Sequence, residues 1–367
     1  RSRRNVEWGR AEMEEALAMG VELSSAGLGR AVEVAAIDGE LKKLWEADEA
    51  STNASLMNFL IYTEDPSQLT ANSETIWSLT QENACRALLI AMDREAPEPS
   101  IEAYITAHCH LAHGKKSICS EQVSFLLKGK SLGRLRNTVF AHLNSDLPLV
   151  FWWQNELSDL FEEGLYRLVD RLIFDSSTWA DPTAGFERIV AAREDTGQSM
   201  ITQDLSWTRS YFFRLATAGL FDDPAAKKSF SAINKVKIVA QKEQRTVALL
   251  LLAWVVELSG WKLLLKNGDS FELSSAEGNL IEASIEWNED GAPLSELSFF
   301  SPDCEIKITR ERGNPHLCQS LCTDGHCLYF SGPADADAPA DLVASQLSRG
   351  GKNSLFLRVL PQFFELL

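Results

Sequence analysis

The sequence predicts an α/β domain followed by an α+β domain. The first should hold a mixed, mostly parallel sheet with flanking helices, and the second an antiparallel sheet. Three observations predict this: apolar runs alternate with helical stretches over residues 55–194, one apolar helix is expected at 243–258, and short strand candidates follow it. At 367 residues, the chain is long enough for about two domains, each with its own core.

The first domain is predicted from a strand, helix, strand alternation after a helical lead. Ser55 to Tyr62 and Cys85 to Met92 are nearly continuous apolar runs around a helical stretch at 66–82, which is the unit of a parallel sheet. The turn His113-Gly114-Lys115-Lys116 predicts a hairpin. The remaining elements are expected as lead helices at 9–24 and 29–48, strands at 102–111, 117–127, 147–153 and 169–174, and helices at 131–143, 156–168 and 182–194.

The second domain is predicted from a change of pattern after Pro224. A helix at 206–220, with apolar positions at near-helical spacing, is expected to bridge the halves, and residues 332–339 read as a polar loop. Strands are expected at 262–266, 270–274, 280–287, 295–300, 304–310, 326–330 and 354–359. The predicted domain limits are 1–50 for the helical lead, 51–224 for the α/β domain and 225–367 for the α+β domain.

The charge balance argues against nucleic acid and membrane partners. Thirty-five basic and 52 acidic side chains leave a net charge of -17, which repels a nucleic-acid backbone or an anionic membrane. The longest apolar stretch, at 247–256, is too short for a membrane helix, and the start lacks a secretory h-region. Seven cysteines without framework spacing favour a reducing compartment. We therefore expect a cytoplasmic protein with protein or small-molecule partners.

Motifs for catalysis are absent from the sequence. It contains no G-x-G-x-x-G after the first strand, no P-loop, no H-E-x-x-H and no G-x-S-x-G, so we expect no cofactor and no enzyme activity. The alternative is an enzyme or sensor that binds a sugar phosphate in a basic pocket. Candidates for that pocket are Lys115, Lys116, Arg134, Arg136, Arg167 and Arg171.

Two cysteine and histidine clusters are candidates for redox or metal chemistry. In the first, strand alternation sends Cys109 to the face opposite its flanking histidines, so a closed metal site is not expected. Cys109 can pair with Cys119 if the hairpin register places them opposite each other, and buried free cysteines are the alternative. The second cluster holds His316, Cys318, Cys322, His326 and Cys327. It is compatible with a structural zinc, a switchable disulfide or unpaired loop cysteines, so a thiol- or metal-based redox sensor is a further alternative.

Three segments carry a resemblance to a known family: SDLPLVFWW from Ser145, LYRLVDRLIFDSS from Leu165 and QDLSWTR from Gln203. Together with ASLMNFLIY, CRALLI, HCHL and ICSEQVSF, they resemble the glucose-6-phosphate dehydrogenase assembly protein family, OpcA. The resemblance implies a non-catalytic protein that binds glucose-6-phosphate dehydrogenase, promotes its active oligomer and raises its activity in the oxidative pentose phosphate pathway. In photosynthetic members it also implies a link to thioredoxin.

The partner-binding candidates are Trp152, Trp153, Asp204, Trp207 and Arg209, because these residue types dominate interface energies. Other interpretations stay open. The two adjacent tryptophans point to opposite faces of a strand, so at least one belongs in the core. The aspartate also fits a helix N-cap, and the DLSWTR segment equally fits a role in closing the domain against its neighbour.

Overall fold

The computed structural model describes residues 28–46, 52–53, 55–112, 116–129, 135–137, 141–323, 325–349, 351 and 354–367. The chain forms two compact units. Unit 1 comprises Arg1–Leu172 with Asp195–Met200, and unit 2 comprises Ile173–Glu194 with Ile201–Leu367. Unit 2 contains residues 173–194 and 201–224, whereas the sequence-based limits assign both segments to the N-terminal α/β domain; the limits of independently folding domains stay a prediction.

Unit 1 is built on a mixed sheet in which most central pairs are parallel. Its hydrogen-bonded order is β1-β5-β6-β4-β3-β7, and β2 pairs with β6. The parallel partners are β3 (Asn58–Thr63), β4 (Arg86–Asp93), β6 (Lys116–Lys128), β7 (Leu149–Trp153) and β2 (Thr52–Asn53), while β5 (Ser100–Ala112) and β1 (Arg30–Val32) run antiparallel to their neighbours. The predicted fold class of the N-terminal half is confirmed.

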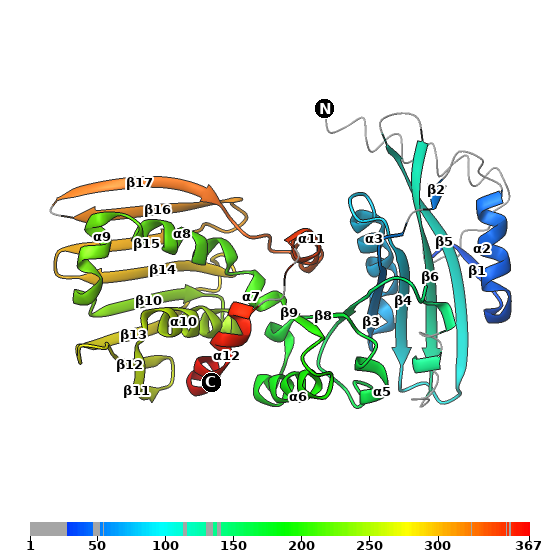
Figure 1. The fold of residues 1–367 in the computed structure, drawn as a ribbon, viewed down its shortest axis with the longest axis horizontal. Helices are drawn as coiled ribbons and strands as arrows, with labels where there is room; N and C mark the ends of the chain where they lie inside the picture. The colour runs from blue at the N-terminus through cyan, green and yellow to red at the C-terminus, as the bar shows by residue number, and fades with distance from the viewer. Residues whose placement is uncertain are drawn as a thin grey trace. The chain divides into compact units, whose positions relative to one another are not determined.

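The central strands of unit 1 are apolar because both faces of the sheet are covered. Every residue of β3 and of β7 is buried. Figure 1 shows α3 (Leu69–Leu79) and α2 (Ile37–Glu46) on opposite sides of the sheet. A buried Asn58 at the start of β3 donates to the backbone oxygens of Asn144 and Leu147 and accepts from the N–H of Asn144, which holds the loop before β7.

Several predicted elements of unit 1 differ from those observed. The predicted helix at 29–48 begins as strand β1, passes through a short 3-10 helix, η1 (Val34–Ala36), and only then becomes α2. The predicted helix at 156–168 is reduced to α5 (Glu163–Tyr166). Within the predicted helix at 131–143, residues 135–137 and 141–142 are helical. The predicted helix at 9–24 and the 113–115 turn lie outside the described residues.

Unit 2 contains an eight-stranded sheet in the order β11-β12-β13-β10-β14-β15-β16-β17. All its pairs are antiparallel except the one between β10 and β13, so the predicted fold class of the C-terminal half is also confirmed. The strands are β10 (Lys235–Ala240), β11 (Lys262–Asn267), β12 (Ser270–Ser274), β13 (Leu280–Trp287), β14 (Leu294–Ser301), β15 (Cys304–Thr309), β16 (His316–Thr323) and β17 (His326–Pro333).

Helices cover one face of this sheet. Figure 1 shows α8 (Tyr211–Phe221), α9 (Pro224–Ser229) and α10 (Arg245–Ser259) on that face. The strands accordingly alternate, as in β10, where Val236, Ile238 and Ala240 are buried. Every residue of α10 from Thr246 to Val256 is buried, because α12 (Ser354–Leu366) packs against it as well as the sheet.

Several elements of unit 2 depart from the sequence prediction, among them strand β16, which was not predicted. The predicted strand at 354–359 is wrong, because it is the first half of helix α12. The predicted helix at 206–220 is two helices, α7 (Leu205–Thr208) and α8, preceded by an unpredicted strand β9 (Ile201–Asp204). The central strand β10 was also not predicted. The predicted loop at 332–339 ends where α11 (Pro339–Arg349) begins.

Candidate functional site

Two of the family-like segments meet in a buried polar network of unit 2. Asp175 follows strand β8 (Arg171–Phe174) and caps the 3-10 helix η3 (Ser176–Thr178), since its carboxylate accepts from the N–H of Ser177. Asp204 ends β9 and caps α7 in the same way through Ser206. The two strand ends thus bring two aspartates and two capped helices together.

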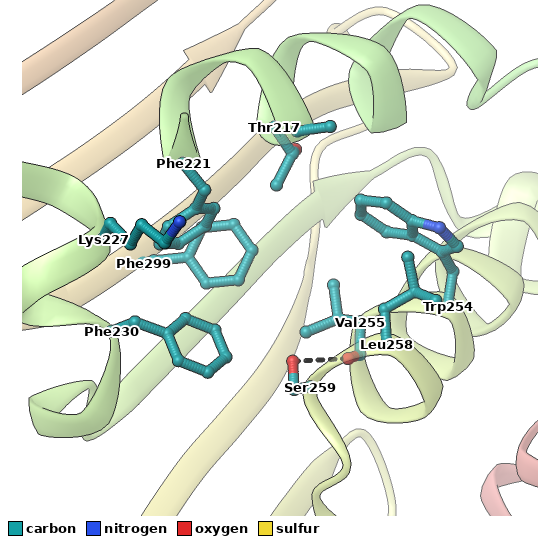
Figure 2. A pocket seen from close by; sticks show the side chains of 10 residues that line it. Thr217, Phe221, Lys227, Phe230, Trp254, Val255, Leu258, Ser259 and Phe299 are labelled. Atoms are coloured by element: carbon teal, nitrogen blue, oxygen red, sulfur yellow. Dashed lines mark hydrogen bonds between the residues drawn. The ribbon is translucent and has the colours of Figure 1, made fainter. Parts of the chain in front are cut away.

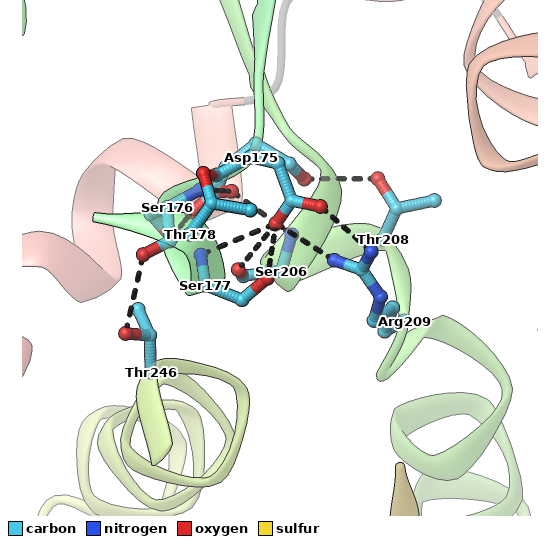
Figure 3. A network of polar contacts seen from close by, with 9 residues as sticks. Asp175, Ser176, Ser177, Thr178, Ser206, Thr208, Arg209 and Thr246 are labelled. Atoms are coloured by element: carbon cyan, nitrogen blue, oxygen red, sulfur yellow. Dashed lines mark hydrogen bonds and ion pairs between the residues drawn. The ribbon is translucent and has the colours of Figure 1, made fainter. Parts of the chain in front are cut away.

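Arg209 joins these segments through a bidentate ion pair. Its Nη1 lies 2.8 Å from Asp175 Oδ1 and its Nη2 lies 2.7 Å from Asp175 Oδ2 (Figure 3). Ser177 Oγ donates to Asp175 Oδ1 over 2.6 Å, and Ser206 Oγ donates to the same oxygen over 3.3 Å. Because both residues of the ion pair are almost fully buried, each depends on the other for compensation of its charge.

Asp204 is the more deeply buried carboxyl of the network. Its Oδ1 accepts from the N–H groups of Ser176 at 3.1 Å and Ser206 at 2.9 Å, and its Oδ2 accepts from Ser176 Oγ at 2.6 Å. Thr208 Oγ1 donates to the backbone oxygen of Asp204, and Thr246 of α10 donates to that of Ser176. The network therefore connects β8, β9, α7 and the central helix α10.

The pKa values of the two aspartates are shifted in opposite directions. Burial would raise the pKa of Asp175, but the hydrogen bonds and positive charge of Arg209 outweigh it and hold that pKa below its ordinary value. Burial raises the pKa of Asp204 to about 7, with Asp175 adding to the increase. All four carboxylate oxygens accept hydrogen bonds from inside the network. The arrangement therefore stabilises the fold around α7.

Trp207 lies in a second cluster built on α7 and α8. The guanidinium carbon of Arg214 lies 3.4 Å from the centroid of the Trp207 ring, and its Nη2 donates to the Trp207 backbone oxygen. Arg349 covers the Tyr211 ring at 3.7 Å and lies 3.8 Å from Asp335. Burial raises the pKa of Asp335 to about 6 and lowers the pKa of Arg214 to about 9. These contacts fix the start of α8.

The adjacent tryptophans of strand β7, Trp152 and Trp153, are core residues in this structure. Trp153 is fully buried; its indole Nε1 donates to the Glu156 backbone oxygen over 2.9 Å, and its ring lies edge-on to that of Phe161. Trp152, on the other face of β7, is 4% exposed. Asp204, Trp207 and Arg209 are buried as well. A direct contact between any of the five candidates and a partner stays a prediction; in this structure all five are buried.

Two pairs of cysteines lie opposite each other on neighbouring strands. A disulfide joins Cys109 of β5 to Cys119 of β6. The strand register places these two residues opposite each other, which was the condition for their pairing. A second joins Cys322 of β16 to Cys327 of β17, whereas Cys318 is free and exposed. The interpretation as unpaired loop cysteines is therefore wrong for this pair, which lies in strands. The described residues contain no group of three or more ligand side chains placed for a metal ion.

The basic residues proposed for a sugar-phosphate pocket are only partly described. Lys115 and Arg134 lie outside the described residues. Arg167 is exposed and forms an ion pair with Glu163 at 2.6 Å. Arg171 is half-buried, and burial lowers its pKa. A basic pocket formed by these groups stays a prediction.

Sequence reasoning missed an apolar pocket on the helical face of unit 2. Figure 2 shows it between α8, α9 and α10, with Phe221, Phe230 and Trp254 as aromatic walls and Phe299 of β14 beneath. Its volume is about 330 Å³. Lys227 also lines it, and Leu258 is 50% exposed there. Phe221 and Phe230 were the available signal in the sequence, but which aromatic residues share a pocket depends on how α8 and α10 pack.

The comparison with solved structures finds distant similarity. A 3-ketoreductase from Actinomadura kijaniata, KijD10, is similar over 84% of this chain and 94% of its own, at 10% identity and a TM-score of 0.47. An aldose-aldose oxidoreductase from Caulobacter crescentus is similar over 84% of this chain and 97% of its own, at 10% identity and a TM-score of 0.46. These values are too low to carry an inference about chemistry. In the described part of the chain, no helix is long and apolar enough to span a membrane.

The sequence comparisons are more specific. One relative is a protein of Nostoc punctiforme described as an OxPP cycle protein, OpcA, and it is 24% identical to this chain over 314 residues. The match covers 77% of this chain and 66% of the relative, which is just under two thirds of its length. Residues 77–191 match the model of the glucose-6-phosphate dehydrogenase subunit N-terminal domain. Residues 201–360 match the model of the corresponding C-terminal domain. With both domain models matched in order along most of its length, the chain belongs to the OpcA family of glucose-6-phosphate dehydrogenase assembly proteins.

Proposed function

We propose that this chain is a non-catalytic allosteric activator and assembly factor. It binds glucose-6-phosphate dehydrogenase and promotes the active oligomer of that enzyme in the oxidative pentose phosphate pathway. The observation that carries the proposal is the match of both OpcA domain models, to residues 77–191 and 201–360. An activator of this kind must bind the active state of the enzyme more tightly than the inactive state, since equal affinity shifts no equilibrium.

The apolar pocket between α8 and α10 is the surface that we propose for docking the dehydrogenase. Its aromatic walls offer the residue types that dominate binding energy, and its volume suits one or two large apolar side chains. Lys227 is exposed at its edge. The chemistry therefore favours an apolar anchor of the enzyme with an acidic group beside it.

The buried candidates Trp207 and Arg209 then act by holding this pocket in shape. Arg209 is tied to Asp175 just before α8 begins at Tyr211. The stacking of Arg214 on Trp207 fixes the first turn of the same helix. Because α8 supplies Phe221 to the pocket wall, loss of these contacts should change the shape of the pocket.

A matched pair of variants tests the docking surface. Leu258→Asp places a carboxylate at the pocket rim, whereas Leu215→Asp places one on α8 at a residue that does not line the pocket; the two leucines are 50% and 53% exposed. We expect the rim variant to bind the dehydrogenase roughly 30-fold more weakly, the loss typical of an interface anchor worth about 2 kcal/mol. The control should bind within about threefold of the parent. Equal affinities for all three proteins would exclude the pocket as the contact.

Redox modulation is a second part of the proposal. The Cys322–Cys327 disulfide joins the two strands of a hairpin, and Cys327 is exposed, so a thioredoxin could reach the disulfide. In the cytoplasm, where we place the protein, such disulfides are usually transient. We expect reduction to change the affinity for the dehydrogenase, and the Cys322→Ser and Cys327→Ser double variant to lose that response. A response retained by the double variant would assign it to another cysteine pair, and no response in the parent would remove redox modulation from the proposal.

A further inference from the structure

The outer strand of the unit 2 sheet, β17, is exposed and apolar. It pairs with β16 on one side, and no strand lies on its other side among the residues that the structure describes. All six residues from His326 to Ser331 are exposed. Leu328, Tyr329 and Phe330 are 50%, 76% and 49% exposed. Its outward N–H and C=O groups therefore form a template for a further strand.

The opposite edge of the same sheet, β11, is protected against such pairing. It carries Lys262 and Lys266 at or near its two ends, and its register with β12 shifts between Leu263 and Leu265. Lysines and bulges are the devices by which sheet edges avoid pairing with other chains. β17 carries no Lys, Arg, Asp or Glu and keeps one unbroken register with β16. Only one of the two edges is thus prepared to accept a strand.

The side chains of β17 are also nearly symmetric about Tyr329. Leu328 and Phe330 flank it, followed by the small residues Cys327 and Ser331. If a second copy of the strand pairs antiparallel about a two-fold axis at Tyr329, each Leu328 lies opposite a Phe330, and each Cys327 lies opposite a Ser331. Aliphatic–aromatic pairs across strands are stabilising, and a two-fold axis requires such a self-complementary patch.

Two further features favour this occupant. The Cys322–Cys327 disulfide holds β17 in register with β16, so little order must be gained when another strand pairs with it. The chain carries a net charge of -17, which makes two copies repel each other in general. An uncharged edge is the surface at which a second copy approaches with the least repulsion.

We propose that β17 pairs with β17 of a second copy of this chain, joining two eight-stranded sheets edge to edge around a two-fold axis at Tyr329. The dimer carries two copies of the apolar pocket, whose lining contains no residue of β17. It therefore exists whether or not the pocket binds the dehydrogenase.

Analytical ultracentrifugation of the full chain, without the dehydrogenase, tests the dimer. We expect a concentration-dependent dimer in the parent protein. Tyr329→Lys, which places two ammonium groups opposite each other at the axis, should weaken the dimer by at least about tenfold. The matched control is Leu264→Lys on β11, at a residue that is 60% exposed, and it should dimerise as the parent does.

A charge swap makes the test independent of any loss of stability. Tyr329→Lys and Tyr329→Glu should each be monomeric alone and should form a dimer when mixed, because the axis then pairs opposite charges. A parent protein that stays monomeric at all concentrations would overturn the proposal. So would a Tyr329→Lys protein that dimerises normally, a mixture that stays monomeric, or loss of the dimer in the β11 control. A monomeric parent whose complex with the dehydrogenase is lost in Tyr329→Lys would assign the edge to the enzyme instead.

Discussion

The buried ion pair between Arg209 and Asp175 should be among the most sensitive contacts of unit 2. Arg209→Met removes two hydrogen bonds of 2.8 and 2.7 Å and leaves a carboxylate that is almost inaccessible to water. Breaking a buried pair by removing one partner costs about 3–5 kcal/mol. For a unit of this size, each kcal/mol lowers the Tm by about 2–4 °C, so the Tm should fall by roughly 6–20 °C.

The assay is thermal unfolding followed by circular dichroism, with Arg167→Met as the control. Both side chains of the Arg167–Glu163 ion pair are exposed, and its loss should lower the unfolding free energy by about 0.5 kcal/mol or less. If Arg209→Met melts within a degree or two of the Arg167→Met control, the assignment of the network as the anchor of α7 is wrong.

The pH dependence supplies a second check on the same pair. The folded protein holds the pKa of Asp175 below its ordinary value, so the stability from this group is present above the unfolded pKa of about 4. It is lost as the pH falls below that value through the folded pKa. In Arg209→Met, burial without the guanidinium raises the pKa of Asp175. The difference in unfolding free energy between parent and variant should therefore shrink as the pH is lowered from 7 toward about 4, and a constant difference would contradict the assigned cause.

Three further outcomes are expected. Asp204→Asn removes a carboxyl whose pKa burial raises to about 7. In the parent protein, the stability contributed by the protonated carboxyl is therefore present below about pH 4 and is lost as the pH rises to about 7. In denaturant titrations, the unfolding free energy of the variant relative to the parent should rise by up to about 4 kcal/mol over that interval and stay level above it. Gly185→Ala places a Cβ against the ring of Trp179, closer than a real Cβ can approach, and should lower the unfolding free energy by about 1–3 kcal/mol; unchanged stability would refute that packing. Thiol labelling with mass spectrometry should modify exposed Cys318 in the folded, unreduced protein, but Cys85 and Cys304 only after unfolding, because both are buried and burial raises their pKa.

The fold class could be predicted because burial leaves a periodic trace in the sequence. The continuous apolar runs of β3, β4 and β7 reflect strands covered on both faces. Strand β10 was missed although KVKIVA alternates, because a six-residue segment that includes two lysines gives little signal. Its central position depends on long-range pairing with β13 and β14. Residues 354–359 resemble a strand locally, yet they form helix α12, whose buried Phe356, Val359, Leu360 and Phe363 have helical spacing.

The candidate site was predictable in its residues but not in their exposure. The sequence singles out FDSS and DLSWTR only as parts of one family resemblance; in the structure each segment ends a strand and caps a helix. Nothing in their spacing shows that Asp204 and Arg209 are buried, because that depends on tertiary packing, such as that of α7 against α10 and α11. The apolar pocket escaped prediction for a related reason: Phe221, Trp254 and Phe299 are far apart in the chain and meet only through packing.

The central claim is activation of glucose-6-phosphate dehydrogenase, and a titration of that enzyme with this protein tests it most directly. The enzyme from the same source is held at fixed concentration and substrate, its rate is measured as this protein is added, and the mixtures are sized in parallel under reducing and oxidising conditions. We predict a saturable rise in rate or apparent substrate affinity together with a co-eluting complex and a larger enzyme oligomer. A rate that does not change and components that elute separately under both conditions would contradict the account.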